Sequence, residues 1–130
     1  MVVIVKSDFF VITNNPMVHN KFKDDYQVDY QEEGDMQVLK TARDYIHAGH
    51  VLLTHPLAGS IKPNETPYKS IMLTKDSQEL SLQSVQIIEE SIQVCEKFSS
   101  TTKDYPQEVF TDFQHIDCSL IENAIASAMV

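Results

Sequence analysis

The chain is poor in glycine, cysteine and basic residues, and each shortage excludes a class of protein. Its three glycines are widely spaced, so they cannot form a glycine-rich phosphate-binding fingerprint. Its two cysteines, Cys95 and Cys118, are too few for a disulfide scaffold. They are also too far apart in the sequence for a dithiol redox motif. We therefore expect two reduced thiols.

The excess of acidic residues argues against negatively charged partners. Ten bases against 19 acids give a formal net charge of −9, which opposes binding to nucleic acid or to an anionic membrane surface. No apolar run approaches the ~20 residues that a membrane-spanning helix needs. The opening segment, Met1–Lys6, has no basic leader followed by an apolar stretch, so we expect a cytoplasmic protein without a secretory signal.

The length and composition fit one globular domain covering residues 1–130. The apolar fraction is 42% and the charged fraction is 22%, as in folded proteins. A chain of 130 residues can bury one substantial core but is too short for two ordinary domains. No repeat, linker or low-complexity tract divides it.

Hydrophobic patterns alternate between the periods of strands and helices. Asn15 before Pro16 is typical of a helix start, Asp35 is a candidate cap for the next helix, and Gly49 is typical of its left-handed end. The expected strands are 8–13, 26–30, 51–54 and 68–74, and the expected helices are 16–24, 35–48 and 81–99.

This alternation predicts an α/β fold. We expect a single three-layer domain in which helices flank a small, mainly parallel sheet. In such sheets, ligands bind outside the carboxyl ends of the strands. Two loops follow such ends, at 13–16 and 54–69. If their strands are parallel neighbours, these loops face one crevice.

The pattern after residue 105 is less regular and suggests two short helices. Pro106 is compatible with a helix start that runs through Phe113. Ser119–Glu122 has the spacing of a capping box, which predicts a second start. Cys118 would then precede a helix, where the pKa of a thiol can fall. Cys95 lies instead on the apolar stripe of the 81–99 helix, as a core residue would.

The 54–69 loop is the strongest candidate for a functional site. It combines lysines, hydroxyl groups and a histidine with three prolines that stiffen it. A helix start at 13–16 also offers backbone N–H groups to an anion. The alternative is that Asn14 and Asn15 only cap and turn the chain. We expect a small anionic metabolite to be bound by these residues: Thr13, Asn14, Asn15, His55, Gly59, Ser60, Lys62, Asn64, Glu65, Tyr68 and Lys69.

Metal binding and catalysis are weaker interpretations of the same region. His47, His50 and His55 lie near Glu65, but no ligand spacing typical of a metal site is present. We expect no metal and no cofactor. His55 is the best candidate for an acid or base, with Ser60 nearby. However, no nucleophile elbow accompanies it, so the catalytic residues are unknown and we lean against an enzyme.

Two blocks of sequence resemble the GrdX family. They are Thr13-Asn14-Asn15-Pro16 and the stretch from Gly49 to Ser70, which contains Thr-His-Pro-Leu-Ala-Gly-Ser-Ile-Lys-Pro-Asn-Glu-Thr-Pro-Tyr-Lys. The resemblance extends over about residues 8–100 in the order of elements. Members are small proteins encoded beside the genes for glycine reductase and related selenium-dependent reductases of amino-acid-fermenting anaerobes. The resemblance implies a cytosolic accessory protein, but it supplies no established activity.

Three functions follow from these observations. The favoured one is a non-catalytic accessory protein of a glycine/betaine reductase-type system that binds a small anionic metabolite at the two loops. The first alternative is a protein–protein module that assembles or regulates reductase subunits, with the stiffened loop as docking surface. The second is a small enzyme that uses His55 as acid or base. The apolar helix faces are also compatible with a homodimer.

Overall fold

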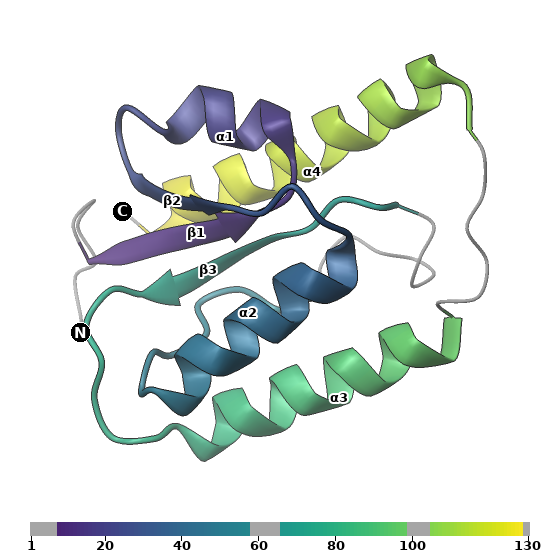
Figure 1. Cartoon of the computed structure of the whole chain (residues 1–130). Helices are drawn as coiled ribbons and strands as arrows, with labels where there is room; N and C mark the ends of the chain where they lie inside the picture. Colours follow the sequence, from purple (N-terminus) through teal and green to yellow (C-terminus); the bar gives the residue numbers. More distant parts are fainter. Residues whose placement is uncertain (1–7, 58–65, 99–104, 129–130) are drawn as a thin grey trace.

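The computed structural model describes residues 8–57, 66–98 and 105–128, and it shows a sheet between two layers of helices (Figure 1). This confirms the predicted α/β class and the three-layer arrangement. None of the helices in these ranges is long and apolar enough to cross a membrane. In chain order the elements are β1 (Phe9–Thr13), α1 (Pro16–Phe22), β2 (Gln27–Tyr30), α2 (Asp35–His47), β3 (Ser70–Thr74), α3 (Leu82–Phe98) and α4 (Gln107–Ala128).

The sheet has the strand order β2-β1-β3 and is mixed, so the expected mainly parallel sheet is wrong in this detail. β1 pairs with β2 in parallel, because α1 carries the chain back between them. β1 pairs with β3 in the antiparallel direction, with Thr13 opposite Ser70. The chain enters β3 from the 54–69 loop at the same edge where β1 ends.

The predicted strand at 51–54 is reduced to one bridge, between Leu52 and Leu73. Side-chain hydroxyl groups take the place of ladder partners on both sides of this bridge. The N–H of Met72 donates to Thr54 Oγ1 at 3.0 Å, and the N–H of Val51 donates to Thr74 Oγ1 at 2.8 Å. The segment therefore lies along β3 without forming a regular ladder.

Each face of the sheet is covered by two helices, which explains why every residue of β1 is buried. Phe10 and Ile12 point toward α2 and α3, and Phe9 and Val11 point toward α1 and α4. The first core also contains Val38, Leu39, Ala42, Ile46, Ile71, Leu73, Ile88, Ile92 and Cys95. The second also contains Val18, Phe22, Met72, Cys118, Ile121 and Ile125.

Most predicted helix boundaries are confirmed. Asn15 caps α1, where its side chain accepts the N–H of Met17. Gly49 follows α2 with a φ of +108°, as a left-handed helix end requires. The cap of α2 differs from the prediction, because Gly34 takes that position and Asp35 is the first helical residue.

The C-terminal region is one helix, α4, and the prediction of two short helices is wrong. Ser119 lies in the middle of α4, so the capping-box interpretation fails. No glycine or proline interrupts the segment, and Cys118, Ile121 and Ile125 form one buried stripe at helical spacing. Cys118 therefore does not precede a helix. Burial raises the pKa of its thiol, which is opposite to the expectation.

Candidate functional site

The candidate site lies at the edge of the sheet where β1 ends and β3 begins. The pairing of Thr13 with Ser70 brings the 13–16 segment beside the residues that lead into β3. The hydroxyl groups of Thr13 and Ser70 are 2.7 Å apart. The structure thus places two segments together that are far apart in the sequence. The condition of the crevice prediction is not met, because β3 lies between β1 and the 51–54 segment.

Asn14 ties three segments together through its side chain. Its Nδ2 donates to the carbonyl of Glu33 at 3.0 Å and to the carbonyl of Pro67 at 2.8 Å. Its Oδ1 accepts the N–H of Lys69 at 2.8 Å. Both amide hydrogens are used in these bonds, so the Asn14 side chain holds the loops in place.

Asn15 is equally engaged. Its Oδ1 accepts the N–H of Met17, and its Nδ2 donates to the carbonyl of Gln114 and to Asp117 Oδ2 at 2.9 and 3.0 Å. Its own N–H donates to Thr13 Oγ1 at 3.0 Å. Asn15 therefore caps α1 and fastens it to α4.

Asp117 is a site residue that the sequence interpretation missed. Its Oδ2 also accepts the hydroxyl of Ser70 at 2.7 Å. Burial raises the pKa of Asp117, although the hydrogen bonds from Asn15 and Ser70 and the charge of Lys69 act in the opposite direction. The sequence does contain a pattern that could have identified Asp117, because Gln114, Asp117 and Ile121 have the spacing of one helical face. This pattern is visible only if residues 107–128 are taken as one helix.

Lys69 is the buried cation of the site, with a relative exposure of 4%. Its Nζ donates to the carbonyl of Pro56 at 3.4 Å. Within the ranges that the structure covers, it forms no ion pair at 4 Å or less. Its charge nevertheless lowers the pKa of both Asp35 and Asp117, so the ammonium acts on two carboxylates without forming an ion pair with either.

Asp35 is the second missed residue. It opens α2 immediately after Gly34, and Asn14 fixes the preceding segment through the carbonyl of Glu33. Its Oδ2 is buried and has no hydrogen-bond partner among the described residues. Burial raises the pKa of this carboxyl, against the effects of Lys69 and the N–H of Met36.

The side chains of Tyr68 and Lys69 point to opposite faces of the sheet. Tyr68 Oη accepts the side-chain N–H of Gln114 on α4 at 2.8 Å. Lys69 acts electrostatically on Asp35 of α2 and Cys95 of α3. Neighbouring side chains of an extended segment alternate in this way. The predicted site is therefore split between the α4 face and the α2–α3 face.

The remaining predicted residues lie at the surface or outside the described ranges. His55 is exposed, and its Nδ1 accepts the N–H of Leu57 at 3.1 Å, a bond that closes a local turn. Five predicted ligand-binding residues lie outside the described residues: Gly59, Ser60, Lys62, Asn64 and Glu65.

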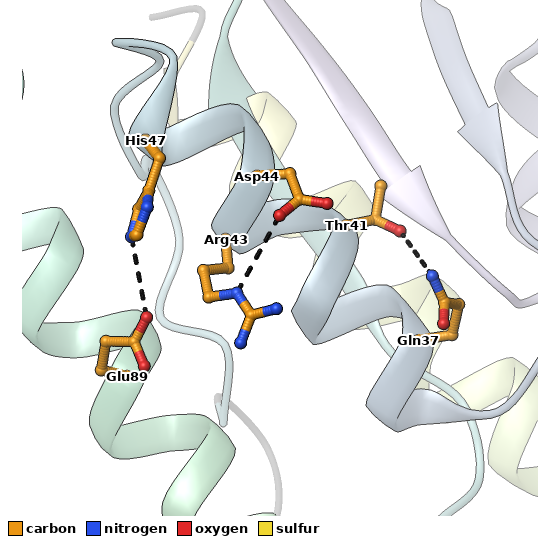
Figure 2. Close-up of polar contacts among 6 residues, drawn as sticks. All are labelled: Gln37, Thr41, Arg43, Asp44, His47 and Glu89. Atoms are coloured by element: carbon orange, nitrogen blue, oxygen red, sulfur yellow. Dashed lines mark hydrogen bonds and ion pairs between the residues drawn. The ribbon is translucent and has the colours of Figure 1, made fainter.

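His47 and His50, the other candidate metal ligands, have separate partners. His47 Nε2 lies 3.7 Å from Glu89 Oε1 and so links α2 to α3 (Figure 2). His50 Nδ1 is 2.8 Å from the carbonyl of Thr74, and its ring packs edge-on against Phe10. In the ranges described, no three His, Cys, Asp or Glu side chains gather as a metal site would require.

The α2–α3 face offers binding groups more clearly than a nucleophile. The Lys69 ammonium can donate to an anion, and Asp35 and the Pro56 carbonyl can accept from a donor. Cys95 is buried, and burial raises the pKa of its thiol despite the opposing charge of Lys69. A protonated, buried thiol is a poor nucleophile.

Comparison with known families matches residues 10–126 to the model described as GrdX-like protein. No curated protein and no solved structure matches the chain. The matched range includes all seven helices and strands except the first residue of β1 and the end of α4. The resemblance noted in the two loop blocks therefore extends over nearly the whole fold, and the chain belongs to the GrdX-like protein family.

Proposed function

We propose that the protein is a cytoplasmic, non-catalytic accessory protein of a glycine/betaine reductase-type amino-acid fermentation system. In this proposal it binds a small anionic metabolite at the sheet edge between the 13–16 and 54–69 loops. Membership of the GrdX-like family supports the accessory role. The contacts of the described residues support a binding role over a catalytic one, since His55 is engaged in a local turn and Cys95 is a buried core thiol.

The binding role is inferred from the burial of Lys69 and from the shortage of acceptors for its ammonium group among the described residues. An ammonium group has three hydrogens to donate, and removing it from water is costly unless acceptors replace the water. Lys69 is 4% exposed, and the one hydrogen bond from its ammonium group to a described residue is 3.4 Å long. A carboxylate or acyl phosphate would supply the missing acceptors. We therefore assign the anion to Lys69.

The two asparagines take a supporting role in this proposal. The hydrogens of both side-chain amides already donate to acceptors within the protein. These amides therefore do not donate to the ligand, in contrast to the expectation from the sequence. Asn14 fixes the backbone of Lys69, and Asn15 fixes α1 against α4. Their function is to hold the segment that carries Lys69 at the sheet edge.

A thermal-shift screen of the purified protein tests the proposal. The ligands are phosphate, acetate, acetyl phosphate and glycine, each compared in wild type, Lys69→Met and Lys75→Met. Lys75 is the matched control, because it is exposed beyond the other end of β3. A ligand that binds only the folded state at ~100 Kd adds ~2.7 kcal/mol of stability. We expect one ligand to raise the Tm of wild type and Lys75→Met but not of Lys69→Met. A flat screen would contradict the proposal.

The assembly alternative has its own supporting observation. Ile116 and Leu120 on α4 are 55% and 39% exposed and lie one helical turn apart. Large apolar side chains gathered at a surface are typical of protein contacts. Retention of a reductase subunit by wild type, but not by an Ile116→Ser/Leu120→Ser double variant, would favour this function. Retention by both proteins would not.

A further inference from the structure

We infer that the ligand at Lys69 carries a positive charge as well as a negative one. The site is built for a small zwitterion, with its carboxylate on Lys69 and its ammonium on Asp35. This inference rests on the proposed function and narrows its ligand class from small anions to small amino acids with a free amino group.

The first argument is that Asp35 Oδ2 and Lys69 Nζ are short of hydrogen-bond partners among the described residues. Asp35 Oδ2 is buried and accepts no hydrogen bond from the described residues. Among the described residues, Lys69 Nζ has one long hydrogen bond, to the carbonyl of Pro56. A buried polar group without a partner is costly, and such groups in a folded protein commonly mark a site that something else fills. A lone anion would supply acceptors to Lys69 and leave Asp35 Oδ2 without a donor from the described residues.

The second argument is that the two groups are fixed near one another but do not meet. The Asn14 side chain binds the carbonyl of Glu33, two residues before Asp35, and also the N–H of Lys69. Both segments are thus held to the same amide group. Lys69 and Asp35 still form no ion pair within 4 Å, although both are described residues. A molecule that bears both charges supplies each group with the partner that it does not find in the other.

The third argument is the charge balance. The charge of Lys69 acts on two carboxylates on opposite sides of the sheet, Asp35 on α2 and Asp117 on α4, so one positive charge stands against two negative charges when both acids are ionised. Cys95 adds no charge while it is protonated, and burial favours that state. An anion would add to the negative charge in a poorly hydrated setting, where such repulsion is strong. A zwitterion adds no net charge.

An ordered water between Lys69 and Asp35 is the competing explanation, because water commonly bridges polar groups farther apart than a hydrogen bond. Calorimetric titration with matched ligands separates the two. Glycine and acetate differ in the amino group alone, as do β-alanine and propionate. We expect wild type to bind one of the amino acids more tightly than its matched acid, by about tenfold or more, as a charge-assisted hydrogen bond allows.

Variants assign each charge to a residue. Asp35→Asn should remove the preference for the amino acid over its matched acid, and Asp35→Glu should restore part of it. Lys69→Met should abolish binding of both. Asp44→Asn, at an exposed position of the same helix, and Lys75→Met are the controls and should bind as wild type does. Thermal unfolding of each variant without ligand shows that it is folded.

Three outcomes would overturn the inference. Equal affinity for glycine and acetate, and for β-alanine and propionate, would refute the zwitterion and leave the proposed anion site standing. An Asp35→Asn variant that loses affinity for amino acid and acid by the same factor would make Asp35 a structural residue only. Failure of every ligand to bind wild type would refute both the inference and the proposed function.

Discussion

Asn14 and Lys69 are joined by two hydrogen bonds just beyond the paired ends of β1 and β3. The side-chain oxygen of Asn14 accepts the N–H of Lys69 at 2.8 Å, and the carbonyl of Lys69 accepts the N–H of Asn14 at 3.3 Å. The asparagine side chain thus continues the sheet where regular pairing stops. This relationship fixes the backbone that carries the buried ammonium.

An Asn14→Asp substitution should therefore destabilise the fold while leaving its shape nearly unchanged. The new carboxylate can still accept the N–H of Lys69, but it cannot donate to the carbonyls of Glu33 and Pro67. We expect the free energy of unfolding to fall by about 3 kcal/mol at neutral pH. The carbonyls of Glu33 and Pro67 would lose their donor and would lie against a negatively charged oxygen, and a buried acceptor without a partner costs this much. Urea denaturation measures the change. Asn123→Asp, at an exposed position of α4, is the control, and equal losses in the two variants would refute the role of Asn14.

A second prediction concerns the pH dependence that Asp117 confers on stability. Burial raises the pKa of this carboxyl above its usual value of 3.8, so the folded protein holds the proton more tightly than the unfolded chain does. The contribution of protonated Asp117 to the free energy of unfolding is then fully present below pH 3.8. It is lost as the pH rises through the higher pKa of the folded state. The free energy of unfolding of wild type, relative to Asp117→Asn, should fall over this window.

Urea denaturation of both proteins from about pH 3.5 to 7 measures this difference. Asn retains an oxygen that can accept from Asn15 and Ser70, so the variant preserves those contacts better than Ala would. Asp112→Asn, an exposed position on the same helix, controls for the general effect of removing a carboxylate. A difference that rises with pH, or that stays constant, would contradict the prediction.

The third prediction is that neither thiol reacts in the folded protein. Cys95 is 1% exposed and Cys118 is 5% exposed, and burial raises the pKa of both. Since the thiolate is the reactive form, a disulfide reagent should label both residues only after denaturation. Spectrophotometric labelling in buffer and in urea measures this. Rapid labelling of Cys118 in buffer would restore the interpretation in which it lies at an exposed helix end.

Features of this fold that are determined by neighbouring residues are predictable from the sequence, whereas features that depend on contacts between distant segments are not. The cap at Asn15 and the helix end at Gly49 follow from short-range chemistry, and both were predicted correctly. The direction of β3 depends on where a long loop returns, which no local pattern records. The split of α4 was predicted from a capping-box pattern at Ser119, but the continuous buried stripe outweighs that pattern.

The candidate site shows the same limit. Sequence patterns pointed to the segments that meet at the sheet edge, and to Lys69 within them. They did not identify Asp35 and Asp117, because each acid becomes part of the site only when a helix packs against the sheet. They also could not show that Tyr68 and Lys69 point to opposite faces, which requires knowledge of the β3 register.

The last prediction compares two glycines that differ in surroundings. Gly49 has a φ of +108°, and a Cβ added there would lie 2.2 Å from the carbonyl oxygen of Gln78. The same backbone is bonded to Gly49, since the N–H of Gln78 donates to its carbonyl at 3.0 Å. Gly49→Ala therefore combines an unfavourable backbone conformation with a backbone clash, and it should lower the free energy of unfolding by at least about 2 kcal/mol.

Gly34→Ala is the matched control for this change. Gly34 caps α2 with a φ of −70°, and nothing lies within 4 Å of an added Cβ. Its substitution should cost less than about 1 kcal/mol, the size of a typical capping effect. Urea denaturation of both variants measures the contrast. If Gly49→Ala were no more destabilising than Gly34→Ala, the close approach of residues 49 and 78 would not exist in solution, because a backbone atom cannot yield as a flexible side chain can.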